Sequence, residues 1–393
     1  MTVRLLSSTL ALGAIATAAA AQDADCPIKV GVLHSLSGTM AISETTLKEV
    51  MEMLVAQQNE KGGVLGCELE AVVVDPASDW PLFAEKAREL LTVQDVDVIF
   101  GNWTSVSRKS VLPVIEELNG LLFYPVQYEG EESSRNVFYT GAAPNQQAIP
   151  AVDYFLEELG VEKFALLGTD YVYPRTTNNI LESYLQSKGI AEEDIFVNYT
   201  PFGHSDWATI VSDVVELAAD GSQVGVISTI NGDANVGFYK ELAAQGVSAE
   251  DIPVVAFSVG EEELSGLDTA PLVGHLAAWN YFMSADTPEN EEFIAAWHEF
   301  IGSEDRVTND PMEAHYIGFN MWVQAVEQAG TTDVDAVREA MWGQEFPNLT
   351  GGTAVMGTNH HLSKPVLIGE ITADGQFDII SETESCVQIQ SNY

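Results

Sequence analysis

Short apolar runs rich in β-branched residues alternate with longer amphipathic runs through the first part of the chain. The apolar runs predict strands over 28–33, 69–74, 96–100 and 121–124. The amphipathic runs between them predict helices over 45–60, 82–91 and 107–118. Strands and helices that alternate with short connections predict a doubly wound parallel α/β sheet.

The same alternation restarts after residue 146. Further helices are predicted over 147–159, 176–188, 207–219 and 235–245, and further strands over 163–167, 194–199, 223–228, 254–257 and 274–282. A long helix over 311–329, a short helix near 334–342 and a β-rich tail within 364–380 follow. Two α/β units without a Pro- or Ser-rich linker predict several chain crossings and a cleft that closes about a hinge.

The first 21 residues have the pattern of a signal peptide. Arg4 precedes an apolar run of small residues that ends in Ala19–Ala21, an A-x-A cleavage site. The run is too short and too rich in alanine for a good membrane span. Cys26 follows aspartates rather than the small apolar residues expected before a lipid-anchored cysteine. We therefore expect a soluble periplasmic protein whose mature chain begins near Gln22.

The charge balance excludes some partners. Lys and Arg number 16 and Asp and Glu 59, so the formal net charge is −43. Nucleic acid and anionic membrane surfaces are therefore not expected partners, because phosphate groups need Lys and Arg. Solubility in a salty medium explains the acidity better than a specific basic partner does.

The chain has three cysteines, and two of them directly precede predicted strands. Cys26 precedes the strand over 28–33, and Cys67 precedes the strand over 69–74. If these strands are parallel neighbours, both thiols lie at one sheet edge within bridging reach. We predict a Cys26–Cys67 disulfide, which leaves Cys386 free. Neither the cysteines nor His360 and His361 have metal-ligand spacing, so no metal or cofactor is expected, and both histidines are predicted on a solvated loop.

Ligands of open α/β sheets bind at the carboxyl ends of strands, so we expect the ligand-binding residues in the loops that follow the predicted strands. Ser105, in NWTSVS, has three interpretations: a nucleophile, a helix cap, or a cap that also grips a ligand oxygen beside free backbone N–H groups. The chain has no G-x-S-x-G elbow, so we favour the third interpretation. Arg108 and Lys109 are expected on the helix surface or between lobes.

Aromatic and acidic residues also gather in these loops. Six aromatic residues lie at or after strand ends: Trp80, Trp103, Tyr124, Tyr128, Tyr171 and Tyr173. Aromatic walls with a few fixed polar groups are typical of a small-molecule pocket. Asp233 and Glu261 follow strands as well, where a solvated helix start is the alternative to a position facing the cleft.

Several of these loops resemble one family. HSLSGTMAISE, VVVDPASDWPLFAEKA, WTSVSRKSVLPV, FYPVQYEGEESSRNVFYTGAAPNQQ, GTDYVYPR and STINGDANVGFYKEL resemble the urea-binding component of urea ABC transporters. The chain is also similar to amide-sensing regulators and branched-chain amino-acid receptors. The resemblance covers the mature chain and implies the type I periplasmic binding protein fold: two Rossmann-like lobes, three crossings and a ligand in the cleft.

The resemblance also implies a division of the chain and a set of site residues. One lobe would hold 27–141 with 284–345, and the other 142–283 with 346–393. The expected ligand contacts are Thr104, Ser105, Tyr124, Gln127, Tyr128, Tyr171, Asn231, Asp233 and Glu261, with Trp80 and Trp103 as walls. Asn102 departs from the cysteine of many urea-type sequences.

The expected function is that of a monomeric binding protein, not an enzyme. It would capture urea and deliver it to the membrane permease of an ABC transporter. One alternative is a receptor for short amides or branched-chain amino acids on the same fold. The other is a secreted amidase, which would need a metal cluster or a nucleophile–base pair that the sequence does not show.

Overall fold

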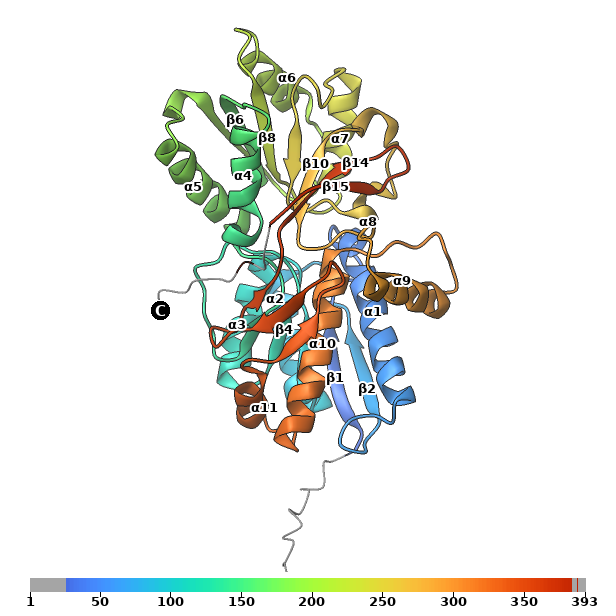
Figure 1. The fold of residues 1–393 in the computed structure, drawn as a ribbon. Helices are drawn as coiled ribbons and strands as arrows, with labels where there is room; N and C mark the ends of the chain where they lie inside the picture. Colours follow the sequence, from blue (N-terminus) through green and yellow to red (C-terminus); the bar gives the residue numbers. More distant parts are fainter. Residues whose placement is uncertain (1–25, 384–386, 388–393) are drawn as a thin grey trace, which may run out of the picture.

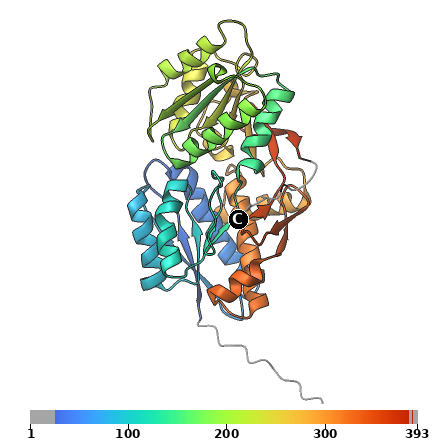
Figure 2. The ribbon, with the colours of Figure 1, turned by 90° about the vertical axis from the view of Figure 1, so that its left-hand side faces the viewer.

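The computed structural model describes residues 26–383 and residue 387. They form two lobes, which lie one above the other in two views a quarter turn apart (Figures 1 and 2). Each lobe is a parallel sheet covered by helices, with buried apolar side chains of its own. The predicted α/β class with two doubly wound lobes is therefore confirmed.

The first lobe is built on a five-stranded parallel sheet with strand order β2-β1-β3-β4-β5. Its strands are β1 (Ile28–Leu33), β2 (Leu69–Val74), β3 (Val98–Gly101), β4 (Leu122–Tyr124) and β5 (Val137–Tyr139). Its helices are α1 (Ala41–Glu60), α2 (Trp80–Glu89), α3 (Ser105–Glu117), α9 (Pro288–Ile301), α10 (Asp310–Ala329) and α11 (Val334–Met341). A π-helical turn, Leu90–Gln94, extends α2.

A small antiparallel sheet completes the first lobe. It contains β11 (Glu345–Pro347), β12 (Thr353–Met356) and β13 (Leu362–Ser363). Ala354, Met356 and Leu362 are buried in the apolar core of the first lobe. The predicted division, which put all of 346–393 in the second lobe, is therefore wrong for these strands, because their apolar side chains are buried in the core that α10 helps to form.

The second lobe is built on a seven-stranded sheet with order β15-β14-β10-β9-β8-β6-β7. Its strands are β6 (Lys163–Thr169), β7 (Ile195–Thr200), β8 (Val224–Thr229), β9 (Val254–Ala256), β10 (Leu276–Trp279), β14 (Leu367–Ile371) and β15 (Phe377–Glu382). The last two form an antiparallel hairpin at one edge. Its α-helices are α4 (Ala148–Glu157), α5 (Val172–Ser187), α6 (Ala208–Leu217), α7 (Ala234–Ala244) and α8 (Glu261–Leu264).

The chain passes between the two cores three times, and one side chain joins these passages. They run from Ala143 to Ala148, from Phe282 to Phe293 and from Leu362 to Leu367. The Asn280 amide donates to the backbone oxygens of Gln146 at 3.0 Å and Pro365 at 2.6 Å. The three-crossing hinge that the family resemblance implied is thus present. The hydrogen bonds of Asn280 hold its crossing segments next to one another.

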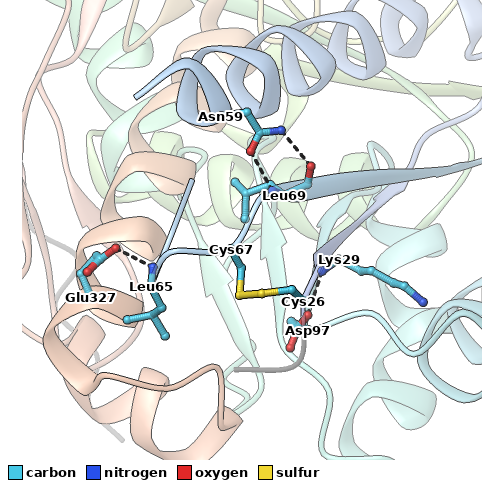
Figure 3. The surroundings of a disulfide bond; sticks show 8 residues. All are labelled: Cys26, Lys29, Asn59, Leu65, Cys67, Leu69, Asp97 and Glu327. Atoms are coloured by element: carbon cyan, nitrogen blue, oxygen red, sulfur yellow. Dashed lines mark hydrogen bonds between the residues drawn. A yellow bond between two sulfur atoms is a disulfide. The ribbon is translucent and has the colours of Figure 1, made fainter. Parts of the chain in front are cut away.

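The predicted disulfide is present (Figure 3). Cys26 and Cys67 are bridged with their Cα atoms 5.3 Å apart. They precede β1 and β2, whose parallel register pairs Ile28 with Leu69, so the strand pairing brings the thiols together. Cys386 and the signal-peptide prediction lie outside the described residues. No helix in the described part of the chain is both long and apolar enough to cross a membrane.

Candidate ligand-binding site

The loops after the parallel strands of the two sheets touch each other across the lobes. Trp103, after β3, donates through its indole N–H to Oδ1 of Asn231, after β8, at 3.3 Å. Ser43 of α1 donates to Glu263 Oε1 of α8 at 2.6 Å, and both side chains are buried. The lobes are therefore closed against each other, and the polar loops lie between them.

The start of α3 divides capping and binding between two neighbouring hydroxyls. Thr104 is the N-cap, and its hydroxyl oxygen accepts from the Ser107 N–H at 3.2 Å. Ser105 is left free for other partners: it donates to Glu129 Oε2 at 2.5 Å and accepts from Arg108 Nη1 at 3.2 Å. The capping interpretation therefore belongs to Thr104, and Ser105 belongs to a buried polar network.

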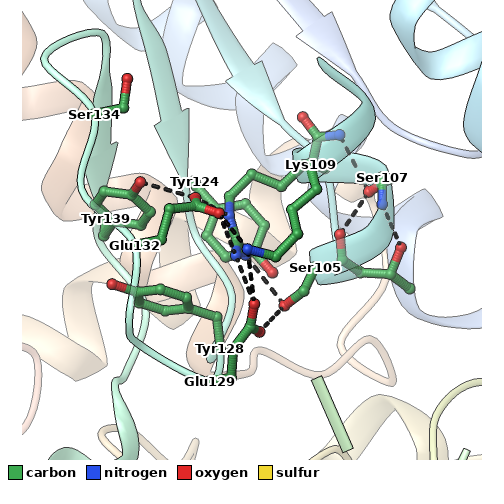
Figure 4. A network of polar contacts seen from close by, with 12 residues as sticks. Ser105, Ser107, Lys109, Tyr124, Tyr128, Glu129, Glu132, Ser134 and Tyr139 are labelled. Atoms are coloured by element: carbon green, nitrogen blue, oxygen red, sulfur yellow. Dashed lines mark hydrogen bonds and ion pairs between the residues drawn. The ribbon is translucent and has the colours of Figure 1, made fainter. Parts of the chain in front are cut away.

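Arg108 is the centre of this network, because it bonds to Ser105, Glu129 and Glu132. Figure 4 shows other members of the network, among them Glu129, Glu132 and Tyr124. The side chain of Arg108 is fully buried, and Nε donates to Glu132 Oε1 at 2.7 Å while Nη2 donates to Glu129 Oε1 at 3.2 Å. The guanidinium carbon lies 4.5 Å from the ring centre of Tyr124 and 4.6 Å from that of Tyr128. A helix-surface position for Arg108 is therefore wrong, because the acidic loop after β4 folds over it.

The formal charges of the network balance. Lys109 Nζ lies 2.7 Å from Glu132 Oε2 and 3.4 Å from Glu129 Oε1. Burial acts to raise the pKa of Glu132, but Arg108 and Lys109 outweigh it and lower that pKa to about 2. Two cations thus face two carboxylates at this point, with no cation left over for a ligand.

A second layer of rings supports the network. The Tyr128 hydroxyl is hydrogen-bonded to His361 Nε2, and the Tyr139 hydroxyl donates to Glu132 at 2.9 Å. The His361 ring stacks on Tyr139 with centroids 4.5 Å apart, and burial lowers the pKa of His361 to about 4. His360 is also buried and stacks on Phe138 at 4.3 Å. The solvated-loop prediction for both histidines is therefore wrong, because β5, which the pattern missed, lies beneath them.

The second lobe contributes an aromatic wall opposite this network. Tyr171 precedes α5, and its ring lies 4.9 Å from Phe202 and 6.2 Å from Tyr173. Burial raises the pKa of Tyr171, and so do Tyr124 and Glu129 of the first lobe. The contributions of Tyr124 and Glu129 put Tyr171 within electrostatic range of the Ser105–Arg108 network.

The two predicted wall residues are both at the junction of the lobes. Trp103 is buried and bonded to Asn231. Trp80, the first residue of α2, is partly buried and packs on Phe202 with centroids 5.2 Å apart. Each tryptophan therefore contacts a residue of the second lobe, Trp103 through Asn231 and Trp80 through Phe202.

Several buried side-chain atoms of the described residues lack a well-aligned hydrogen-bond partner. Those at this junction include the Gln127 side-chain oxygen and the Tyr173 hydroxyl. The Tyr173 hydroxyl lies near Gln127 and Ser258, which act to lower its pKa against the larger effect of burial. The Gln127 oxygen can accept a hydrogen bond and the Tyr173 hydroxyl can donate one, so a ligand with both a donor and an acceptor could use both atoms.

Two acidic residues of the predicted site lie elsewhere. Asp233 is exposed at the start of α7. Glu261 is buried, but its Oε1 accepts from the Met283 N–H at 2.7 Å, beside the hinge. Burial, with smaller contributions from Glu263 and Asp310, raises the pKa of Glu261 to about 8.

The acidic residue that sequence reasoning missed is Glu129. Glu129 follows Tyr128 in the stretch PVQYEG, which is one of those that resemble the urea-binding family. That resemblance, rather than a position at a strand end, could have identified it. Among the described residues, no group of three or more His, Cys, Asp or Glu side chains is placed to hold a metal ion.

Comparison with known proteins shows which family this chain belongs to. The model of the periplasmic binding protein domain matches residues 28–392. A Leu/Ile/Val-binding protein homologue from Brucella melitensis is 23% identical over 369 residues, which are 92% of this chain and 91% of that protein. A protein named limonene hydroxylase from Geobacillus stearothermophilus is 34% identical over 111 residues, but these are 28% of this chain and 20% of that protein.

Solved structures match the fold over nearly the whole chain. An ABC-transporter solute-binding protein from R. palustris, solved with 4-hydroxybenzoate, has a TM-score of 0.78 at 20% identity, covering 92% of this chain and 98% of that one. A leucine-binding protein from Thermotoga maritima has a TM-score of 0.77 at 18% identity, covering 90% and 98%. With a family model that spans both lobes and a fold shared at these scores, the chain belongs to the periplasmic binding protein family and has its type I, two-lobed architecture.

Proposed function

We propose that this protein captures urea, or a similarly short neutral amide, between its lobes and delivers it to the permease of an ABC transporter. The observation that carries the proposal is the self-balanced buried network at the start of α3. Arg108, the buried cation of that network, already faces Glu129 and Glu132. A binding site with no spare charge favours a ligand without charge.

A carboxylate ligand fits this network poorly. A buried charge needs a partner of opposite sign, and an unpaired one costs several kcal/mol. Leucine and 4-hydroxybenzoate, which the names of the two similar structures give as their ligands, both carry a carboxylate. In this chain such a group would lie near Glu129, with the guanidinium of Arg108 already in use.

Urea matches the groups that the junction offers. It has four N–H donors, one carbonyl acceptor and a flat shape. Glu129 and the Gln127 oxygen can accept from its N–H groups, while the Tyr173 hydroxyl can donate to its carbonyl. The rings of Tyr171, Tyr124 and Trp103 supply flat walls.

The size of urea sets an upper limit on affinity. At a ceiling of about −1.5 kcal/mol per heavy atom, four heavy atoms give roughly −6 kcal/mol, or a Kd of tens of micromolar. Closure of the lobes, joined here by the Trp103–Asn231 and Ser43–Glu263 bonds, would then present the surface that the permease recognises. Export to the periplasm fits the family, and cleavage near Ala21 is part of the proposal.

Titration calorimetry of the mature protein with urea, acetamide, leucine and 4-hydroxybenzoate tests the ligand. We expect heat of binding with urea, weaker binding with acetamide and none with the two acids. Binding of leucine without binding of urea would overturn the proposal in favour of an amino-acid receptor. Release of ammonia on incubation with urea would replace binding by hydrolysis.

A further inference from the structure

We infer that Glu129 is a built-in carboxylate that fills an anion site at the start of α3 and thereby makes the protein reject anionic ligands. The inference deepens the proposed function and depends on it only for the identity of the neutral ligand. It predicts that removal of one side chain changes the charge class of ligand that the protein accepts.

Three features of the first turn of α3 together make an anion site. Ser105 is the first residue of a thirteen-residue helix, where backbone N–H groups and the helix dipole favour negative charge. Its hydroxyl is a donor, and Arg108, one turn later, points its guanidinium at the same place. A hydroxyl and a guanidinium that converge in this way are the usual partners of a carboxylate.

Glu129 occupies this site with both of its oxygens. Oε2 accepts from Ser105 at 2.5 Å, and Oε1 accepts from Arg108 at 3.2 Å and lies 3.4 Å from Lys109 Nζ. The side chain is 2% exposed, so it is held away from solvent. A second anion beside it would meet like charge in a buried place, where water screens repulsion poorly.

Glu132 has a different position and a different task. It binds Arg108 Nε, Lys109 and the Tyr139 hydroxyl, on the side of the guanidinium away from Ser105. Figure 4 shows Glu129 beside Ser105 and Glu132 beside Tyr139. Glu132 therefore neutralises the cations, while Glu129 alone fills the place next to the helix start.

Acetate is the right probe, because Glu129→Ala removes a CH₂–COO⁻ group and acetate supplies the same fragment. We expect the wild type to show no acetate binding and the Glu129→Ala variant to bind acetate with a Kd of about 1 mM, since four heavy atoms cannot give high affinity. Acetate at tens of millimolar should raise the melting temperature of this variant only.

Matched variants separate this effect from a general loss of charge. Glu131→Ala removes an exposed glutamate two residues away and should gain no acetate binding. Glu129→Gln keeps the site filled with a neutral group and should gain none either. The double variant Glu129→Ala with Ser105→Ala should bind acetate at least tenfold more weakly than Glu129→Ala.

The outcomes are decisive in both directions. A folded Glu129→Ala variant without acetate binding, or acetate binding that survives loss of Ser105, overturns the inference. If Glu129→Ala folds only in acetate, the inference is supported; if it folds in neither condition, Glu129→Ser, which leaves Arg108 a hydroxyl partner, is tested with formate by the same criteria. If the wild type fails to bind urea while Glu129→Ala gains acetate, the proposed function fails and this inference stands.

Discussion

The side-chain amide nitrogen of Gln127 donates a 2.7 Å hydrogen bond to the hydroxyl of Ser258. Gln127 follows β4 of the first lobe, and Ser258 follows β9 of the second, so the bond joins the lobes. Both side chains are buried. Because the bond requires the lobes to be closed, its free energy contributes to closure and therefore to ligand affinity.

Removal of this bond should weaken ligand binding more than folding. We expect Ser258→Ala to raise the Kd for urea about five- to tenfold, the effect of losing roughly 1 kcal/mol from one hydrogen bond. Calorimetry measures the Kd, and a guanidinium chloride titration measures the free energy of unfolding. Ser265→Ala is the control, because its exposed hydroxyl donates to the Glu262 backbone oxygen within the same turn. An unchanged Kd in Ser258→Ala would show that the bond does not favour the closed form.

The Tyr171 hydroxyl should contribute to urea binding. Tyr171→Phe keeps the ring against Phe202 and Tyr173 but removes the hydroxyl whose pKa Glu129 helps to raise. We expect about a five- to tenfold rise in the Kd for urea, with the free energy of unfolding changed by less than about 0.5 kcal/mol. Tyr184→Phe, which removes from α5 a hydroxyl that donates to Asp153 of α4, should leave the Kd unchanged. Equal effects of the two variants would remove Tyr171 from the site.

The elements that could be predicted from sequence are those whose own residues carry the signal. The predicted strands 28–33 and 69–74 coincide with β1 and β2, and the long helix begins one residue before its predicted start. The short strand β5 and the sheet β11–β13 were not predicted, because two to four residues cannot show a period. α9 was also missed, since its first turn, PENEE, is polar and its apolar residues come late.

The limits of sequence reasoning at the site have the same cause. Ser105 was identified because strand ends and helix starts are visible in the pattern. The burial of Arg108 was not, since it depends on the loop between β4 and β5, residues 125–136, folding back over α3. Likewise His361 is buried by contact with Tyr139, far from it in sequence. Tertiary contacts therefore decide which acidic residue bonds to Ser105 and Arg108. That residue is Glu129, whereas Glu261 bonds to the Met283 backbone.

The raised pKa of Glu261 predicts a pH dependence of stability. Its pKa is about 8 in the folded protein against an ordinary value of 4.5, so between these pH values the folded state holds a proton that the unfolded state lacks. The free energy of unfolding should therefore fall as pH rises from about 5 to 8, by at most about 1.4 kcal/mol per pH unit from this group.

Glu261→Gln tests this dependence, because the amide stays neutral at every pH. Guanidinium chloride titrations at pH 5, 6, 7 and 8 should give a flatter profile for Glu261→Gln than for the wild type. Part of the slope will remain, since burial also raises the pKa of Glu262 to about 7. Glu70→Gln, at an exposed position on β2, should keep the wild-type profile. Parallel profiles for wild type and Glu261→Gln would contradict the prediction.

The Cys26–Cys67 disulfide should stabilise the first lobe. The two cysteines are 41 residues apart, and closing a loop of this length removes unfolded-state entropy worth about 4 kcal/mol in the chain-entropy description. We expect the double variant Cys26→Ser with Cys67→Ser to lose up to that amount, measured by guanidinium chloride unfolding. The Kd for urea should stay within about twofold, since the bridge lies at the amino ends of β1 and β2, away from the candidate site. A stability equal to that of the wild type would show that the bridge acts only in folding kinetics or not at all.

Asn280 should be the residue on which the hinge depends most. Its amide donates to the Gln146 and Pro365 backbone oxygens, and its own N–H donates to Asp310 Oδ2 at 2.8 Å. Asn280→Ala leaves two buried carbonyl oxygens without their donors, so we expect a loss of about 2–4 kcal/mol in the free energy of unfolding. Asn320→Ala on α10, whose amide bonds to a carbonyl of its own helix at 2.8 Å, should lose less than about 1 kcal/mol.

The hinge bonds should also set how freely the lobes open. Because the Asn280 bonds hold the crossings side by side, their loss should broaden the range of lobe orientations as well as lower stability. Small-angle scattering without urea should then give a larger radius of gyration for Asn280→Ala than for the wild type, and saturating urea should bring the two values together. If Asn280→Ala is destabilised but its radius matches the wild type without urea, the bonds stabilise the crossings without restricting the opening of the lobes.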